Sequence, residues 1–334
     1  MAGARHGGAE AFFVRLAAAL HRAGLPQRVA IRRDPDRAAA LRAQGIEPVE
    51  LPFGGWLDFR TGRALRRLAA QWRPRVVVGW MNRASALLPE GPFVRVGRLG
   101  GYYDLKYYRR CHHLIGNTED IVAYVVRAGW PADRAHYLPN FVDAAPAPAA
   151  DRARLDTRAD APVLLAAGRL HPNKGFDVLL TALAAVPDAI LWLAGEGPER
   201  AALSRRAAEL GITDRVRLLG WRDDVAALYG AADVLVCPSR HEPLGNVVLE
   251  GWARGVPVVA AASAGPAGLV RDGETGLLVP VDDADALAAA LRRVLADPTL
   301  RARLADAGRA EHARRFTEAA VVGRYLDFFA RIAA

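Results

Sequence analysis

Short apolar runs alternate with helix-period patterns along the whole chain. In residues 8–23 the apolar side chains recur every three or four positions, which predicts a helix with one apolar face. The first half continues with strands expected at 27–33, 46–52, 75–80, 92–99 and 112–117, and helices at 35–44, 60–72 and 118–129. Alternation of buried strands and helices predicts a parallel sheet covered on both faces.

A proline- and alanine-rich segment, 138–162, interrupts this alternation. It has four prolines and no hydrophobic period, so we expect a domain boundary near residue 145. The alternation then restarts, with strands expected at 162–168, 189–194, 215–219, 233–237, 256–260 and 276–280, and helices at 175–186, 198–210, 223–230, 245–254, 283–296, 299–313 and 317–334. The fold class expected is therefore α/β, with two Rossmann-like doubly wound domains facing across a cleft, and ligands at the carboxyl ends of strands.

Composition leaves several classes of partner open. The 334 residues are 52% hydrophobic and 24% charged, as in ordinary soluble proteins, and no apolar run is long enough to span a bilayer. The net charge of +9 fits nucleic acid, an anionic membrane surface or anionic substrates. Only two of the 45 basic residues are lysines. A lysine that occurs within a motif is therefore more indicative of a functional role in this chain than in a chain of ordinary composition. Cys111 and Cys237 lack metal-ligand spacing, which favours free thiols and a cytoplasmic location.

The densest group of candidate residues lies in CPSRHEPLGNVVLEGWARGVPVVA, 237–260. A strand is expected to end at Cys237, and a helix to start just after Glu242. Unpaired N–H groups at a helix start can hold a phosphate or a hydroxyl-rich ligand. Glu242 could accept hydrogen bonds from sugar hydroxyls, and Glu250, two turns along, could bind a vicinal diol such as ribose. Either glutamate alone is more often simply exposed, so the joint arrangement carries the hypothesis.

A second group lies in LLAAGRLHPNKGFDVLL, 164–180. A buried strand leads to Arg169, and Lys174 stands where the next helix begins. Cations five residues apart across such a loop can converge on a diphosphate from two sides. The alternative is a solvated loop lysine, which the scarcity of lysine in this chain makes the weaker reading.

Together these segments resemble the retaining glycosyltransferases of family 4, which have the two-domain GT-B fold. The resemblance rests on GRLHPNKG (168–175), Glu242 and Glu250 in an E-x7-E pair, GVPVVA (255–260), VRDGETGLLVP (270–280) and HGGAE (6–10). EPLGN and NTEDIVAYV (117–125) are most similar to members that build lipopolysaccharide cores or other surface glycans. The resemblance implies an acceptor-binding domain at 1–145, a nucleotide-sugar domain at 146–315, and a helix at 316–334 that returns to the first domain.

The resemblance also implies a role for each candidate residue. Arg169 and Lys174 would neutralise the diphosphate and stabilise the departing charge, while Glu242 would orient the donor sugar. Trp221 would lie beside the base or only pack. The remaining donor contacts would come from Gly7, Gly8, Leu244, Gly245, Asn246, Val247 and Glu250. The implied reaction moves a sugar with retention from a uridine or guanosine diphosphate sugar to a glycan or lipid-linked acceptor, without a metal or other cofactor.

The acceptor side departs from the family pattern. Many members carry a histidine in the loop that here reads GRLGGYYDLKYYRR, 97–110, and this loop has none. His112 and His113 follow it, where packing or capping is the ordinary role of a histidine. Tyr102 and Asp104 are therefore the acceptor-side candidates.

Other classes fit less well. A nicotinamide dehydrogenase would need a G-x-G-x-x-G turn, which is absent. A metal-dependent GT-A enzyme would need an Asp-x-Asp pair at a strand end, whereas DPD (34–36) and DDAD (282–285) stand at helix starts as caps. A nucleic-acid binder would need a recognisable module, so no nucleic-acid partner is expected. A GT-B sugar-nucleotide epimerase and a degenerate, non-catalytic transferase stay open as alternatives.

Two stretches of the first half, 56–75 and 101–110, combine arginines with aromatic residues. In the first, Phe59, Leu65, Leu68 and Trp72 are expected to form an apolar side among the arginines. Such a helix either lies on an anionic leaflet, which would make the protein peripheral at the inner membrane, or packs into the core with a solvated arginine face.

The first ten residues, MAGARHGGAE, place a glycine turn almost at the start. In the family this turn follows a central strand of the first sheet, of which residues 1–3 could be only the end. Backbone groups left unpaired on both neighbours would cost roughly 1–3 kcal/mol each. We therefore expect that strand to be missing, a gap or drawn-together strands in its place, and a natural start several residues upstream.

Overall fold

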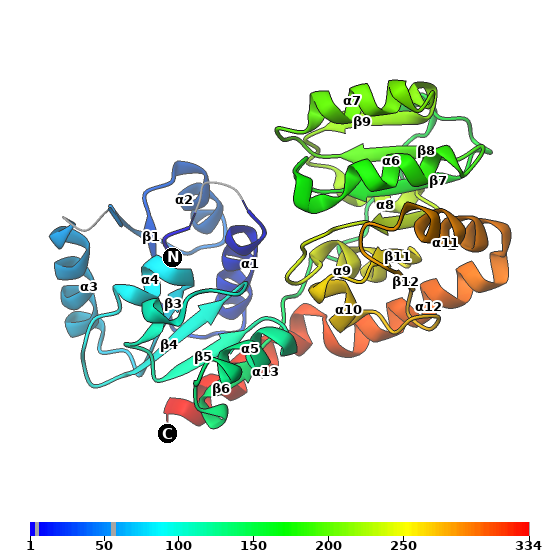
Figure 1. The fold of residues 1–334 in the computed structure, drawn as a ribbon. Coiled ribbons are helices and arrows are strands. Elements are labelled where there is room, and N and C mark those ends of the chain that lie inside the picture. Colours follow the sequence, from blue (N-terminus) through cyan, green and yellow to red (C-terminus); the bar gives the residue numbers. More distant parts are fainter. Residues whose placement is uncertain (4–6, 55–57, 334) are drawn as a thin grey trace. The chain divides into compact units, whose positions relative to one another are not determined.

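The computed structural model describes residues 1–3, 7–54 and 58–333, and the chain divides into two compact units (Figure 1). The first unit comprises Met1–Phe141 and Glu318–Ala334, and the second comprises Val142–Thr317. The second unit thus begins within a few residues of the boundary expected near 145. The last helix groups with the first unit rather than with the domain that precedes it in the sequence.

The second unit is built on a six-stranded parallel sheet with the order β12-β11-β10-β7-β8-β9. Its strands are β7 (Val163–Ala167), β8 (Ile190–Ala194), β9 (Val216–Gly220), β10 (Val234–Cys237), β11 (Val258–Ala261) and β12 (Leu277–Val279). Each lies at the position that the apolar runs predicted. The chain adds β8 and β9 on one side of β7 and then returns to place β10 on the other side, so the strand order reverses between β7 and β10. Ligands bind at such reversals in open α/β sheets.

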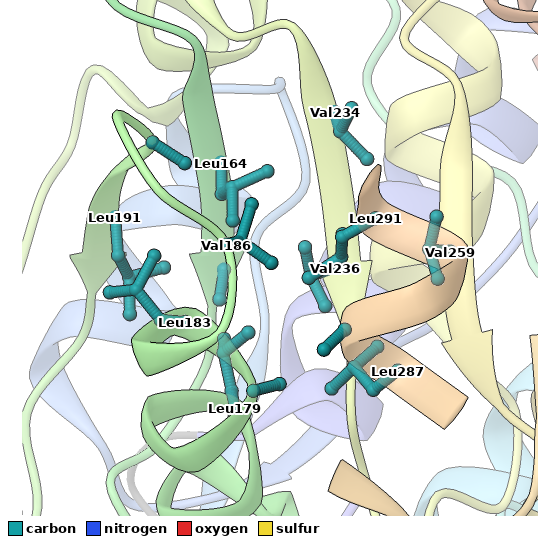
Figure 2. Packing of buried hydrophobic residues seen from close by; sticks show 14 of the residues in the cluster. Leu164, Leu179, Leu183, Val186, Leu191, Val234, Val236, Val259, Leu287 and Leu291 are labelled. Carbon is teal, nitrogen blue, oxygen red and sulfur yellow. The ribbon is translucent and has the colours of Figure 1, made fainter. Parts of the chain in front are cut away.

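Both faces of this sheet are covered by helices. They are α6 (Phe176–Ala184), α7 (Arg200–Glu209), α8 (Val225–Ala231), α9 (Asn246–Ala253), α10 (Ala264–Leu269), α11 (Ala284–Ala296) and α12 (Pro298–Arg315), with short 3-10 turns η3 (Ala153–Leu155), η4 (Pro172–Lys174) and η5 (Thr213–Arg215). Figure 2 shows one face, where Leu179 of α6 and Leu287 of α11 pack toward Val236 of β10. The opposite face packs on α8 and α9. Burial on both faces explains why these strands read as continuous apolar runs.

The first unit has two separate parallel sheets. The larger contains β3 (Val76–Trp80), β4 (Val94–Leu99), β5 (His113–Gly116) and β6 (Ala135–Tyr137), and the smaller contains β1 (Ala30–Arg32) and β2 (Val49–Leu51). The helices are α1 (Gly8–Arg22), α2 (Pro35–Arg42), α3 (Phe59–Trp72), α4 (Met81–Ala86), α5 (Glu119–Arg127) and α13 (Glu318–Ala333), with 3-10 turns η1 (Leu105–Tyr108) and η2 (Ala132–Arg134). The sequence did not predict β6 or α4.

A gap separates β1 from β3, as expected for a sheet that lacks a central strand. A cavity of about 670 Å³ lies there, lined mostly by apolar residues, among them residues of both strands and of α1, α3 and α13. Met1 pairs with β1 at the edge of the gap: its amino group donates to the Ala30 carbonyl (2.7 Å), and its carbonyl accepts from the Arg32 N–H (2.8 Å). The upstream start of the natural protein stays a prediction.

A buried arginine binds α13 into the first unit, next to β5 and β6 (Figure 1). Arg98 is fully buried at the end of β4 and donates to the Tyr325 hydroxyl (3.1 Å) and to Asn140 Oδ1 (2.5 Å). Its guanidinium carbon lies 4.2 Å from the centroid of the Trp80 ring and 4.9 Å from that of Phe12. Neutral acceptors and aromatic faces thus stabilise this buried charge.

Candidate active site

Strand pairing brings the two groups of candidate residues in the second unit together. β7 and β10 are neighbours, with Leu164 beside Val234 in register, so the loops that follow them leave the same edge of the sheet. The loops are also hydrogen-bonded to each other: the His241 N–H donates to the Asn173 carbonyl (3.1 Å), and Arg240 donates to the Pro172 carbonyl (2.8 Å). Segments about 70 residues apart in sequence thus form one structure.

Gly175 makes this close approach feasible. Its φ of 62° is left-handed, and a Cβ at this position would lie 2.2 Å from the Pro238 carbonyl oxygen. Any larger residue would push the two loops apart, because backbone cannot yield by that much. The glycine of the GRLHPNKG motif therefore permits Lys174, the residue before it, to reach the loop after β10.

Lys174 and Glu242 form an ion pair across the two loops. The Lys174 ammonium donates to Glu242 Oε2, and the N–H of Gly245 donates to Glu242 Oε1 (3.2 Å). The two side chains are only 23% and 14% exposed. Burial alone would lower the pKa of Lys174, but the adjacent Glu242 carboxylate outweighs burial and raises that pKa above its usual value. Lys174 is therefore a fixed positive charge at neutral pH, held in place by Glu242.

Arg169 lies in the same loop as Lys174 but is exposed. It makes no ion pair or hydrogen bond with any residue that the structure describes. A guanidinium in this state keeps its donors for a ligand, and its planar fork suits phosphate oxygens. The loop after β7 thus carries two cations: Lys174, which the Glu242 carboxylate holds in place, and Arg169, whose guanidinium has no partner among the described residues.

The start of α9 follows Glu242 by four residues in the sequence and is hydrogen-bonded to it through Gly245. Gly245 is its N-cap, with a φ of 85° and no side chain to cap the first N–H groups. Leu244 is buried, whereas Asn246 and Val247 are half-buried. A helix start without a side-chain cap can offer backbone donors to anionic or hydroxyl groups. The Gly245 N–H is used by Glu242, and the donor role expected for residues 244–247 stays a prediction.

Glu250 lies one turn further along α9 and is held by a residue that the sequence did not single out. Tyr229 of α8 is 1% exposed, and its hydroxyl donates to Glu250 Oε2 (2.8 Å). Burial, and then the charge of Glu250, raises the pKa of Tyr229 well above its usual value, so the hydroxyl stays protonated. Tyr229 sits among apolar positions in sequence, where a tyrosine is normally a core residue, so no pattern revealed this contact.

The first turn of α10 is the second contributor that sequence reasoning missed. The N–H of Gly265 donates to the Glu242 carbonyl (2.7 Å), and a Cβ at Gly265 would lie 2.4 Å from the carbonyl carbon of Leu244. This helix start therefore packs directly on the backbone of the Glu242 loop and fixes its path. The Gly-Pro pair at 265–266 is the signal that could have indicated a close backbone approach.

Trp221 follows β9 at the edge of the sheet. Its side chain is 69% exposed, and its Nε1–H donates to Asp223 Oδ1 (3.0 Å). The ring is thus presented to solvent rather than packed into the core. One strand, β8, separates β9 from β7, so strand pairing does not set Trp221 directly beside Lys174 and Glu242. Its role beside a base stays a prediction.

The remaining candidates belong to the first unit. Gly7 and Gly8 are exposed at the start of α1, where Gly7 is the N-cap. Tyr102 donates to Asp120; burial, followed by this hydrogen bond, raises the pKa of Tyr102 to about 12. Asp104 caps η1 and pairs with Lys106 (2.8 Å), which lowers the pKa of the Asp104 carboxyl. Both acceptor-side candidates are thus engaged in local contacts.

The two histidines after the acceptor-side loop have structural partners. The Arg95 N–H donates to His112 Nδ1 (3.1 Å). His113 Nδ1 lies 3.0 Å from His136 Nε2, and both rings contact Phe328 of α13. These contacts agree with the packing role expected for them.

In the part of the chain that the structure describes, no helix combines the length and apolar character needed to cross a membrane.

Comparison with known proteins identifies the family. The family model "Glycosyltransferase Family 4" matches residues 6–145, and "Glycosyl transferases group 1" matches residues 149–311. Two proteins of Rhizobium meliloti (strain 1021), the lipopolysaccharide core biosynthesis glycosyltransferases LpsE and LpsD, are each 39% identical to this chain. The matches cover 98% of the chain and 96% of LpsE, and 97% of the chain and 95% of LpsD.

The same architecture occurs in a solved structure. Anabaena Alr3699/HepE in complex with UDP superposes with a TM-score of 0.88, over 99% of this chain and 98% of that one, at 21% identity. At this identity the likeness concerns the fold, which is that of GT-B glycosyltransferases as the sequence predicted.

Proposed function

The chain belongs to glycosyltransferase family 4, and on that premise we propose that it transfers a sugar, with retention, from a nucleotide diphosphate sugar to the growing core of a lipopolysaccharide or a related surface glycan. Support for this acceptor class comes from LpsE and LpsD, which match the chain over nearly its whole length. Support for the donor class comes from the bound UDP in the HepE structure of the same fold. The donor is a uridine or guanosine diphosphate sugar.

The ion pair between Lys174 and Glu242 is the observation that carries this proposal. An ammonium group has three N–H donors, and Glu242 uses one, so two remain for the oxygens of a diphosphate. A carboxylate has about four acceptor sites, and Lys174 and the Gly245 N–H use two, so the others can accept from sugar hydroxyls. One fixed pair can thus hold both halves of a sugar nucleotide.

The charges suit departure of a diphosphate. When the bond from the sugar C1 to the phosphate oxygen breaks, its electron pair leaves with the diphosphate. Lys174 and Arg169 would stabilise this growing negative charge, and they need no reorganisation because the loop already presents them. The acceptor hydroxyl would attack C1 on the same face, and its proton would pass to the departing phosphate oxygen, which gives retention.

The rest of the site would hold the nucleotide. Residues Leu244 to Val247, at the start of α9, would lie against the phosphate and sugar oxygens, with the Gly245 N–H already donated to Glu242. Glu250, oriented by Tyr229, would accept hydrogen bonds from the ribose hydroxyls. We propose no metal or other cofactor, since two cationic side chains take the charge-neutralising role. Cys111 and Cys237 are free and buried, which is in keeping with the cytoplasmic location proposed for the reaction.

A donor and acceptor panel tests this function. The purified chain is incubated with uridine and guanosine diphosphate sugars, with and without truncated lipopolysaccharide core acceptors, and both nucleotide release and acceptor mass are followed. We expect one donor to give acceptor-dependent nucleotide release and a product heavier by one sugar. An altered sugar nucleotide formed without an acceptor would establish the epimerase alternative instead. Thermal stabilisation by a nucleotide, without turnover on any acceptor, would indicate a protein that only binds.

A further inference from the structure

Arg240 lies in the loop after β10, two residues before Glu242, and its guanidinium contacts three other segments of the second unit. Its Nη1 and Nη2 groups donate to the two carboxylate oxygens of Asp177 (2.8 and 2.7 Å). Nη1 also donates to the Pro172 carbonyl (2.8 Å), and Nε donates to Asp282 Oδ1 (2.5 Å). These contacts use four of the five N–H donors of an arginine, so Arg240 is committed to the protein rather than to a ligand.

The partners of Arg240 lie on both sides of Lys174 in the sequence. Pro172 begins η4, the turn that ends at Lys174, and Asp177 is in the first turn of α6, the helix that follows. The hydrogen bonds from Arg240 lower the pKa of Asp177, so this carboxylate stays ionised at neutral pH. One guanidinium thus joins the segment that carries Lys174 to the loop that carries Glu242.

The contact between Arg240 and Asp177 fixes direction as well as distance. Two parallel bonds between a planar guanidinium and a carboxylate resist rotation, whereas a single N–H···O=C bond does not. The backbone bond from His241 to Asn173 (3.1 Å), which also joins the two loops, is of the second kind. Without the guanidinium the loops would therefore stay joined but could shift, and a shift of about 1 Å near a reacting group can cost about 100-fold in rate.

We propose that Arg240 is a positioning residue for the sugar transfer. Its two bonds to Asp177 would set the distance between the Lys174 ammonium and the Glu242 carboxylate at which this pair holds both the diphosphate and the sugar. This inference rests on the proposed function, which assigns the pair to the donor. The substitution Arg240→Lys keeps the positive charge but removes the two parallel bonds.

The same unit offers a matched arginine away from the candidate site. Arg152 donates to Asp233 Oδ2 (2.9 Å) and to the Ala231 carbonyl (2.8 Å), and its side chain is 24% exposed, against 30% for Arg240. Asp233 precedes β10, so this contact lies at the amino edge of the sheet, opposite the edge of the candidate site. Arg152→Lys therefore measures the loss of an arginine contact that does not hold the pair.

Transfer rates measured with Lys174 present and in Lys174→Ala test the proposal. With Lys174 present, Arg240→Lys and Asp177→Asn should each lower kcat about tenfold or more. Arg152→Lys should keep the wild-type kcat. In Lys174→Ala no pair remains to be positioned, so adding Arg240→Lys should change the residual kcat less than about twofold. Equal melting temperatures of Arg240→Lys and Arg152→Lys would exclude misfolding, and Asp177→Asn carries the test if Arg240→Lys does not fold.

Three results would overturn the proposal: wild-type kcat in both Arg240→Lys and Asp177→Asn, an equal loss in Arg152→Lys, or the same fold-loss from Arg240→Lys with and without Lys174. Failure of the proposed function gives a different pattern, because then the wild type transfers no sugar, or Lys174→Ala transfers at the wild-type rate. The two failures can therefore be distinguished.

Discussion

The hydroxyl of Tyr229 donates a 2.8 Å hydrogen bond to the carboxylate of Glu250. The tyrosine is almost completely buried in α8, whereas Glu250 is half-buried one turn along α9. A core residue thus fixes the orientation of a carboxylate that we assign to the ribose. Tyr229 would orient Glu250 without touching the substrate itself. Kinetic measurements can therefore distinguish its positioning role from the role of a residue that contacts the substrate.

Tyr229→Phe should raise the KM for the sugar nucleotide and leave kcat nearly unchanged. Loss of one hydrogen bond to a charged group costs about 1.5–3 kcal/mol, which corresponds to roughly 10- to 100-fold in KM. Initial rates over a range of donor concentrations measure both constants. Tyr325→Phe is the control, because Tyr325 is an equally buried tyrosine that also loses one hydrogen bond, to Arg98 in the first unit. If both variants raise KM alike, the effect is one of stability and Tyr229 has no positioning role.

Acid should destabilise the first unit through His136. Burial, and then the neighbouring His113, lowers the pKa of His136 from 6.5 to about 4. The unfolded chain therefore binds a proton between these pH values that the folded chain does not, so stability contributed by neutral His136 is lost as the pH falls from 6.5 toward 4. Denaturant titrations near both ends of this window measure the change. His136→Gln should show a smaller loss than the wild type; an equal loss in both would assign the acid sensitivity to other groups.

Activity should survive a chelator. In the proposed reaction Arg169 and Lys174 neutralise the diphosphate, and no three His, Cys, Asp or Glu side chains among the described residues group as metal ligands. Transfer rates before and after treatment with excess EDTA should therefore agree. Loss of activity with EDTA and recovery with a divalent cation would mean that a metal shares the charge-neutralising role.

The product should keep the anomeric configuration of the donor sugar. If Glu242 binds the sugar hydroxyls and Lys174 binds the diphosphate, both side chains occupy the leaving-group side, and the acceptor enters on that side too. The coupling constant of the anomeric proton in the purified product reports its configuration directly. An inverted product would require a base on the opposite face and would exclude the one-face reaction.

The strands of the second unit could be predicted from sequence because they are buried on both faces. Uninterrupted apolar runs such as 163–167 and 234–237 are typical of interior strands of a parallel sheet, so the position of each strand in the sequence is clear. The candidate site followed from the same pattern, since Lys174 and Glu242 each come just after one of these strands. Which strands are neighbours is a matter of topology, and only the structure shows that β7 and β10 pair.

Other features depended on contacts that leave no local pattern. The strand β6 has only three residues, including His136, and its pairing with β5 identifies it rather than any period in its sequence. Tyr229 reads as a core tyrosine and becomes a site residue only through Glu250.

The apolar side expected in residues 59–72 included Phe59, but Phe59 is 76% exposed. At 100° per residue it lies in line with the exposed Arg63 and Arg66 of α3, which helical periodicity alone could have shown.

The central claim, that Lys174 and Glu242 form the donor site of a glycosyltransferase, is tested most directly by their single and double variants. Acceptor-dependent transfer should fall by a few powers of ten in Lys174→Ala and in Glu242→Ala, since loss of one preorganised partner costs about 3–4 kcal/mol of barrier. The double variant should be far less impaired than the product of the two single losses, because the residues act as one pair. Arg293→Ala, an exposed arginine of the same unit, should match the wild type. Wild-type transfer by either single variant, with the fold intact, would contradict the account.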